Sequence, residues 1–296
     1  METYNSIDKA VKGVFGENVK MRRDSRISRQ DINSVKVITL SNGKNIFFKF
    51  KAIANKGMLE AELEGIEAIA STGTIDTPNI YCLGIDEETS VSFIMMELIK
   101  EGVKTERAIG MLGNKMANLH LADTSKFVEG GKYGFLHDNY IGANKQINTP
   151  KDSWTDFFRE CRLEPQIKMA EKHLTSMMRE VSRFMDKLDT LLIEPERPSL
   201  VHGDMWGGNH IINYHRMPVL IDPAVYVGHS EVDIAMTQMF EPFPRVFYDI
   251  YHQKMPKEDG YEDRREIYNL YHFLNHLNIF GIKYLMPVKK TILRHA

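Results

Sequence analysis

The first hundred residues alternate short apolar runs with turn-forming residues, as a small sheet requires. The runs at residues 35–40 (VKVITL) and 45–50 (NIFFKF) predict two strands. Between them stands Asn42-Gly43, a strong hairpin signal because these residue types tolerate the positive φ of tight turns. Residues 81–85 and 91–98 form two further apolar runs on either side of an acidic turn, and they predict a second pair of strands.

Apolar residues repeat at helical spacing elsewhere in the chain. In residues 58–72 one stripe consists of Leu59, Leu63, Ile66 and Ile69, and four glutamates lie on other faces. A shorter amphipathic helix is predicted over residues 7–15. After about Ile99 the pattern becomes mainly helical, and the main candidate segments are residues 105–122, 153–174, 175–193 and 266–285.

These elements predict an α+β chain in two lobes. The first lobe, residues 1–97, combines an antiparallel sheet with a helix, because its strand and helix patterns alternate. The second lobe, residues 98–296, is larger and mainly helical.

The composition is that of an ordinary globular protein. Of 296 residues 43% are hydrophobic and 26% are charged, and the formal net charge of -2 gives no basic field for nucleic acid. The two cysteines are too few for a disulfide framework. The N-terminus lacks a signal-peptide pattern, and no apolar run approaches the roughly 18 residues that span a bilayer. We expect a soluble cytoplasmic protein that binds neither nucleic acid nor membrane; the sequence carries no signal of its oligomeric state.

Residues 199–212 (SLVHGDMWGGNHII) place His202, Asp204 and Asn209 between two apolar runs. Phosphoryl transfer in protein-kinase-like enzymes needs one carboxylate to orient and deprotonate the attacking hydroxyl, and an amide with a second carboxylate to hold Mg²⁺. A short pair of strands after Asn209 would bring Asp222 beside it. Hard oxygen ligands of this kind suit Mg²⁺.

Two other interpretations of these residues stay open. Asp and Asn commonly close turns on their own backbone, and His202 could be a hydrogen-bonded core residue. A zinc site is a weaker alternative, because histidines 202, 210 and 215 lack metal-site spacing. His272 and His276 stand four residues apart, but such a pair supplies only two ligands, so packing or surface roles are expected for them.

A kinase also needs a strand lysine that grips the nucleotide phosphates and a helical glutamate that orients it. Lys49 lies within the strand run 45–50, and Glu62 lies in the next predicted helix. Lys51 and the other glutamates of that helix are alternatives, since an acidic helix face is usually solvated. The segment Glu97, Leu98 and Ile99 after the last predicted strand is the expected hinge, whose backbone would pair with adenine.

The chain resembles the fructosamine kinase (ketosamine kinase) family, a branch of the aminoglycoside-phosphotransferase-like kinases. The most specific motifs are HGDMWGGN at residues 202–209 and IDPAVYVGHSEVDIAM at residues 221–236. Supporting segments run through nearly the whole chain: MLEAELEGIEAIASTGTIDTPNI, YGFLHDNYIG, WTDFFRECRLEPQ and LYHFLNHLNIFG. A bare HGDxxxxN also fits choline, homoserine and aminoglycoside kinases, whereas Trp206 and GHSEVDIAM are narrower.

This resemblance implies a two-lobed protein-kinase-like fold, a nucleotide-binding first lobe and a catalytic second lobe, with ATP and Mg²⁺ as cofactors. The substrate would be a ketosamine, either a small free one or one on a glycated protein lysine. Phosphorylation on the third sugar carbon would destabilise the adduct and lead to deglycation. The roles that the resemblance implies are catalytic base for Asp204, metal ligands for Asn209 and Asp222, phosphate-gripping pair for Lys49 and Glu62, and substrate platform for Trp206. His229, Glu231 and Asp233 would brace the metal loop and the following helix.

One departure from the family concerns the loop that covers the phosphates. Relatives usually carry two glycines where this chain has Arg29 and Gln30. Glycine allows close backbone approach to phosphate, and an arginine could instead contact it directly. This loop contains no cysteine, so the thiol switch of some relatives is not expected. A kinase of another small hydroxyl compound, such as an aminoglycoside or amino alcohol, and a nucleotide-binding pseudokinase are the competing hypotheses.

Overall fold

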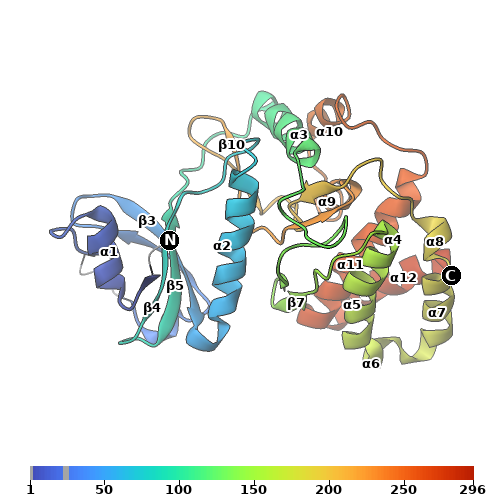
Figure 1. Ribbon diagram of the computed structural model, residues 1–296, viewed down its shortest axis with the longest axis horizontal. Coiled ribbons are helices and arrows are strands. Elements are labelled where there is room, and N and C mark those ends of the chain that lie inside the picture. The colour runs from blue at the N-terminus through green and yellow to red at the C-terminus, as the bar shows by residue number, and fades with distance from the viewer. Residues whose placement is uncertain (1–2, 23–26) are drawn as a thin grey trace.

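A five-stranded sheet forms the centre of the N-terminal lobe (Figure 1). The computed structural model describes residues 3–22 and 27–296. The strands are β1 (Thr3–Tyr4), β2 (Val35–Thr39), β3 (Asn45–Ala52), β4 (Ile80–Asp86) and β5 (Val91–Glu97), in the order β1-β4-β5-β3-β2. All neighbouring pairs are antiparallel except β1 with β4, which is parallel. The predicted antiparallel sheet therefore has one additional strand that runs parallel to its neighbour.

Two helices cover opposite faces of this sheet (Figure 1). Helix α1 (Ile7–Phe15) packs in one cluster with Phe48, Phe50 and Phe93, whereas α2 (Lys56–Ala70) packs with Ile94 and Met96. Side chains alternate between the two faces of a strand. Lys49, between Phe48 and Phe50, therefore faces the α2 side.

The predicted hairpin exists, but its turn is longer than the tight two-residue type. Thr39 pairs with Asn45, and the Leu40 amide donates to the Lys44 carbonyl at 2.8 Å. Within the turn Gly43 has a φ of 83° and Asn42 does not adopt a positive φ. The longer turn needs left-handed backbone at one position rather than two.

The C-terminal lobe is mainly helical, as predicted. Its helices are α3 (Glu106–Leu121), α4 (Trp154–Phe158), α5 (Glu164–Met169), α6 (Glu171–Leu174), α7 (Met178–Asp186), α8 (Leu188–Leu191), α9 (Glu231–Met236), α10 (Arg245–Tyr251), α11 (Tyr261–Phe280) and α12 (Leu285–His295). Short 3₁₀ turns lie at Arg29–Asp31, Ile53–Asn55, Thr175–Met177 and Ile282–Tyr284. The pattern over residues 153–174 is not one helix, because a π-helical turn at Arg159–Leu163 separates α4 from α5.

Three short two-stranded sheets position the loops of this lobe. They pair β6 (Asn139–Ile141) with β7 (Asn144–Gln146), β8 (Ser199–Val201) with β11 (Tyr226–Gly228), and β9 (His210–Ile212) with β10 (Pro218–Leu220). The N-terminal sheet ends with β5 at Glu97, and the first helix of the C-terminal lobe, α3, begins at Glu106. The exact boundary between the lobes, expected after residue 97, remains a prediction. Among the described residues no helix combines the length and apolar character needed to cross a membrane.

Candidate active site

The loop between β8 and β9 carries His202, Asp204 and Asn209 and is held rigidly. Gly203 has a φ of 79°, and a Cβ on it would lie 2.1 Å from the carbonyl oxygen of Ala224, so only glycine fits there. The buried His202 donates from Nε2 to the Ile221 carbonyl at 2.9 Å and accepts the Asp204 amide at Nδ1. Burial lowers the pKa of His202, so this histidine is a neutral brace.

Asp233, in the first turn of α9, anchors the same loop. Its carboxylate accepts the backbone amides of His202 at 2.7 Å and Gly203 at 2.9 Å. His120 of α3 lies 3.0 Å away and also bonds Tyr251. Burial alone would raise the pKa of Asp233, but the hydrogen bond with His120 and the other donors lower it, so Asp233 is an ionised anchor.

Asp204 and Asn209 lie together. The Asn209 amide Nδ2 donates to the Asp204 backbone carbonyl at 2.8 Å and to its carboxylate Oδ2 at 2.9 Å. Burial raises the pKa of Asp204 to about 7, against the opposing effect of this hydrogen bond. Both hydrogen bonds come from the amide nitrogen of Asn209, so its amide oxygen remains available to accept or coordinate a ligand.

Lys49, Glu62 and Asp222 meet at one charged cluster between the lobes. Lys49 Nζ lies 2.5 Å from Glu62 Oε1 and also pairs with Asp222. Burial alone would lower the pKa of Lys49, but the charges of Glu62 and Asp222 outweigh it and raise the pKa. Asp222 has a φ of 55° and stands next to Ile221, whose amide donates to the Asn209 carbonyl at 3.1 Å.

These residues surround one cavity of about 400 Å³, the inter-lobe cavity, lined in part by Lys49, Glu62, Asp204, Asn209 and Asp222. Asn33 and Ser34 also line it, although neither belongs to a motif that could be recognised in the sequence. The loop that differs from the family pattern contains the 3₁₀ turn at Arg29–Asp31. After this turn Asn33 has a φ of 63°, and its backbone amide donates to the Phe50 carbonyl of β3 at 3.0 Å, which attaches the end of the loop to β3. Gln30 is not in the cavity lining.

The expected hinge residues lie outside this lining. Glu97 ends β5, and its carboxylate accepts the Asn79 side-chain amide at 2.7 Å. Neither Glu97, Leu98 nor Ile99 lines the inter-lobe cavity, so their contact with adenine remains a prediction.

A second cavity of about 430 Å³, the aromatic cavity, meets the first at Asp204 and Trp206; its other walls include Phe240, His276, Phe280 and Tyr284. Trp206 is 42% exposed, so it is not a buried core residue. Its ring contacts Phe240 edge-to-face with centroids 6.3 Å apart. The aromatic cavity thus opens directly onto the Asp204 carboxylate.

His276 is a residue of this cavity that sequence reasoning assigned to packing or the surface. Its Nδ1 donates to the His272 carbonyl at 2.7 Å, so Nε2 is a hydrogen-bond acceptor. Burial lowers the pKa of His276 and keeps the ring neutral. The described residues contain no group of three or more His, Cys, Asp and Glu side chains placed to hold a metal, which argues against the zinc alternative.

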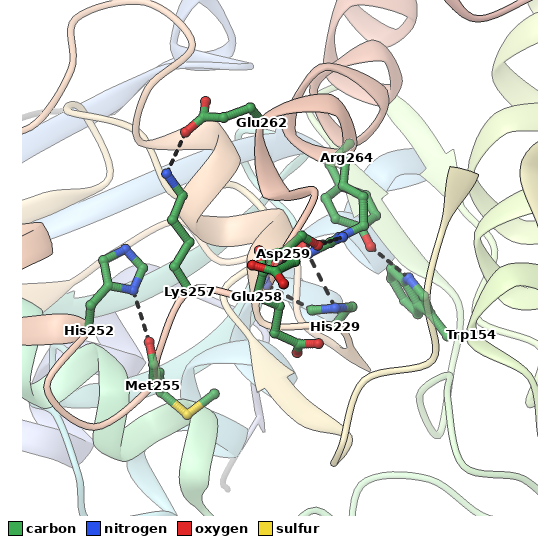
Figure 2. Close-up of polar contacts among 11 residues, drawn as sticks. Trp154, His229, His252, Met255, Lys257, Glu258, Asp259, Glu262 and Arg264 are labelled. Atoms are coloured by element: carbon green, nitrogen blue, oxygen red, sulfur yellow. Dashed lines mark hydrogen bonds and ion pairs between the residues drawn. The ribbon is translucent and has the colours of Figure 1, made fainter. Parts of the chain in front are cut away.

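His229, Glu231 and Asp233 were expected to brace the metal loop and the following helix; Figure 2 shows His229 and Arg264 from this region. The carboxylate of Glu231 accepts two hydrogen bonds from Arg264 of α11, at 2.8 and 2.7 Å. His229 accepts the Glu231 amide at Nδ1, and burial lowers the pKa of this histidine to about 3. These contacts join α9, and with it the Asp233 anchor, to α11.

Comparison with known proteins agrees with this geometry. The family model described as fructosamine kinase matches residues 3–295. A Synechocystis protein named as a probable ketoamine kinase is 35% identical over 290 residues, covering 98% of this chain and 95% of that protein. The chloroplastic protein-ribulosamine 3-kinase of Arabidopsis thaliana is 38% identical over 247 residues, which cover 81% of this chain and 72% of that protein.

A crystal structure from Haemophilus somnus, named as a "putative fructosamine-3-kinase", superimposes with a TM-score of 0.83 at 26% identity, covering 98% of this chain and 96% of that one. This similarity confirms the two-lobed protein-kinase-like fold class expected from the sequence. The protein is a phosphotransferase with an alcohol group as acceptor. Because the family model matches nearly the whole chain, the chain belongs to the fructosamine kinase family.

Proposed function

We propose that this protein is an ATP-dependent kinase that phosphorylates the third-carbon hydroxyl of ketosamines of the fructosamine or ribulosamine type. One observation carries the proposal: Asp204 lies where the inter-lobe cavity and the aromatic cavity meet. A hydroxyl bound in the aromatic cavity would therefore face phosphates bound in the inter-lobe cavity. The relatives named for ketoamines and ribulosamines support this acceptor. The phosphorylated adduct would then decompose, which is deglycation.

Asp204 is the proposed catalytic base. It accepts the proton of the sugar hydroxyl while the hydroxyl oxygen bonds to the γ-phosphorus and the bond to the ADP oxygen breaks. Burial supports this role because it raises the pKa of Asp204 to about 7, so the carboxylate binds a proton more readily than an exposed one. Asp233 supports the geometry by holding both amides ahead of Asp204.

Lys49, oriented by Glu62, is the proposed partner of the nucleotide phosphates. Its ammonium pairs with Glu62 and Asp222, and all three residues line the inter-lobe cavity. Asn209 and Asp222 fit Mg²⁺, because the amide oxygen of Asn209 and the half-exposed carboxylate of Asp222 are hard oxygen ligands on the same cavity. Bound there, the ion would neutralise charge on the phosphates.

Trp206 is the proposed platform for the sugar ring. It is exposed on the aromatic cavity next to Asp204, and an indole face binds the apolar face of a sugar. A polycationic aminoglycoside fits less well, since Asp204 is the one acidic side chain in the described lining of the aromatic cavity. The set of Lys49, Asp204, Asn209 and Asp222 likewise argues against a pseudokinase.

The test is a transfer assay with Mg-ATP and fructosyl-lysine, ribulosyl-lysine, psicosyl-lysine, choline and a panel of aminoglycosides. We expect phosphate on one or more ketosamines and on none of the other compounds. Phosphate transfer to choline or an aminoglycoside alone would show that this compound, and not a ketosamine, is the acceptor. The absence of both turnover and nucleotide-dependent thermal stabilisation would point to a pseudokinase.

A further inference from the structure

The aromatic cavity shares part of its wall with a third cavity. This distal cavity, of about 350 Å³, is lined in part by Asn144, Met169, Lys172, His173, Ile279 and Phe280. Ile279 and Phe280 line both cavities, so the end of α11 forms their common wall. We call these two adjacent cavities together the groove; its lining includes Asp204 on one side of Phe280 and Lys172 of α6 on the other.

The walls of the first part of this groove are unusually apolar for an exposed surface. Phe280 is 56% exposed and Phe240 is 46% exposed, and both flank His276 with ring centroids 5.4 Å away. Tyr284 extends the row, 4.9 Å from His276. Adjacent exposed aromatic rings of this kind mark a binding surface that suits the methylene groups of an alkyl chain. Lys283 Nζ lies 5.5 Å from the centroid of the Phe280 ring and 5.1 Å from that of Tyr284, so this surface already carries a positive charge of the protein.

The charges change along the groove. The described lining of the aromatic cavity contains no lysine or arginine, and Asp204 lies at its inner end. The distal cavity contains Lys172, and its described lining has no acidic side chain. A substrate with its sugar at Asp204 and an alkyl stem over Phe280 would therefore reach a basic region at its far end.

We propose that Phe280 is a specificity-determining residue that holds the alkyl stem of the ketosamine, and that Lys172 binds an acidic group beyond the stem. This inference rests on the proposed function and narrows its substrate class to ketosamines on a long-chain amine within an acidic peptide. A ketosamine without a stem uses the sugar site but leaves the Phe280 surface empty.

The experiment compares three substrates: 1-amino-1-deoxyfructose, a fructosyl-lysine peptide flanked by glutamates, and the same peptide flanked by lysines. For the wild type we expect the highest kcat/KM with the glutamate-flanked peptide and the lowest with the stemless compound. Phe280→Ala should lower kcat/KM for both peptides about tenfold, mainly through KM, and should lower it clearly less for the stemless compound. Phe280→Leu should restore part of the loss because it keeps an apolar surface.

Lys172→Glu should reverse the preference between the two peptides and leave the stemless compound unchanged. The matched controls are Leu293→Ala, a 59% exposed apolar residue of α12, and Lys187→Glu, an exposed lysine; neither lines the groove. We expect both controls to behave as the wild type.

Two results would overturn the inference while the proposed function stands: equal kcat/KM for stemless and peptide substrates in the wild type, or an unchanged ratio between them in Phe280→Ala. If the wild type phosphorylates none of the three substrates, the proposed function itself fails, and this inference fails with it.

Discussion

Lys49 contacts two carboxylates that come from different lobes, Glu62 of α2 and Asp222 after β10. Alternation along β3 puts Lys49 and Lys51 on the same face of the sheet, so the sequence pattern could not choose between them. The position of α2 on the sheet decides the pairing with Glu62. Residue types and spacing thus predicted the candidates, whereas the contacts between elements determined which of them meet.

Lys49→Met is expected to lower kcat for ketosamine phosphorylation by about 10²–10³-fold, because a preorganised charge facing the phosphates is lost. Lys51→Met is the matched control, since Lys51 lines the same cavity and forms no ion pair with Asp222. Steady-state kinetics of both variants checks the assignment. Equal losses in the two variants would contradict a special role for Lys49.

Several buried histidines make stability depend on pH under mildly acidic conditions, and His229 and His272 are two of them. Burial lowers the pKa of both His229 and His272 to about 3, so the folded protein holds them neutral while the unfolded chain protonates them below about pH 6.5. Above pH 6.5 both histidines are neutral in the folded and in the unfolded chain, and they cost no stability. As the pH falls from 6.5 towards 3, the unfolded chain binds protons that the folded protein does not, and the folded state loses stability. Each should reduce the free energy of unfolding by roughly 1.4 kcal/mol for each pH unit below 6.5.

Urea unfolding at pH 7.5 and pH 5.5 measures this loss. His272→Asn should lose less stability on acidification than the wild type does, whatever its stability at pH 7.5. His215→Asn changes an exposed histidine and should show the slope of the wild type. An unchanged slope in His272→Asn would rule out this source of acid sensitivity.

At the scale of elements, α9 and α11 are joined by one buried ion pair. The side chains of Arg264 and Glu231 are only 3% and 10% exposed, and their two hydrogen bonds link α11 to the helix that carries Asp233. A second link is the Asn269 side chain of α11, which donates to the Ala235 carbonyl at 2.9 Å. Removing one partner leaves the other charged and buried. The brace expected from the GHSEVDIAM motif is therefore a connection between helices, and its partner Arg264 could not be found from the motif alone.

Arg264→Met is expected to lower the free energy of unfolding by about 3–5 kcal/mol. The matched control is Arg245→Met, whose side chain is 91% exposed and pairs with Asp249 one turn along α10; it should change stability little. Chemical denaturation of both variants makes the comparison. A loss in Arg264→Met as small as that in the control would mean that the pair does not brace the lobe.

The hairpin and the helix patterns at residues 7–15, 58–72 and 105–122 were predictable because local spacing and turn residues specify them. The break within residues 153–174 had a local signal that the periodicity hid: Pro165, in the first turn of α5, has no backbone N–H to continue a helix from the preceding turn. The aromatic cavity was also missed. Its residues Phe240, His276 and Phe280 come from a loop and from α11, where aromatic residues at helical spacing look like core.

At the scale of the whole molecule, both lobes contribute polar side chains to the inter-lobe cavity: Lys49 and Glu62 come from the first lobe, and Asp204, Asn209 and Asp222 come from the second. A nucleotide bound there would contact both lobes and stabilise the folded chain. The expected gain is about 2.7 kcal/mol at a ligand concentration one hundred times Kd.

Thermal unfolding with AMP-PNP, with and without Mg²⁺, checks this expectation. The wild type should show a higher Tm with AMP-PNP and a further rise with Mg²⁺. Asn209→Ala should retain the first rise and lose most of the second, because it removes a proposed metal ligand. A Mg²⁺-dependent rise as large in Asn209→Ala as in the wild type would remove Asn209 from the metal site.

The most direct test of the central claim is phosphate transfer to a ketosamine by the wild type and by Asp204→Asn, followed by ³¹P NMR. The account predicts a phosphate monoester on the third sugar carbon with the wild type. It predicts a loss of at least about 10²-fold in kcat for Asp204→Asn, which should still bind Mg-AMP-PNP. Full activity of Asp204→Asn on the same ketosamine would contradict the account.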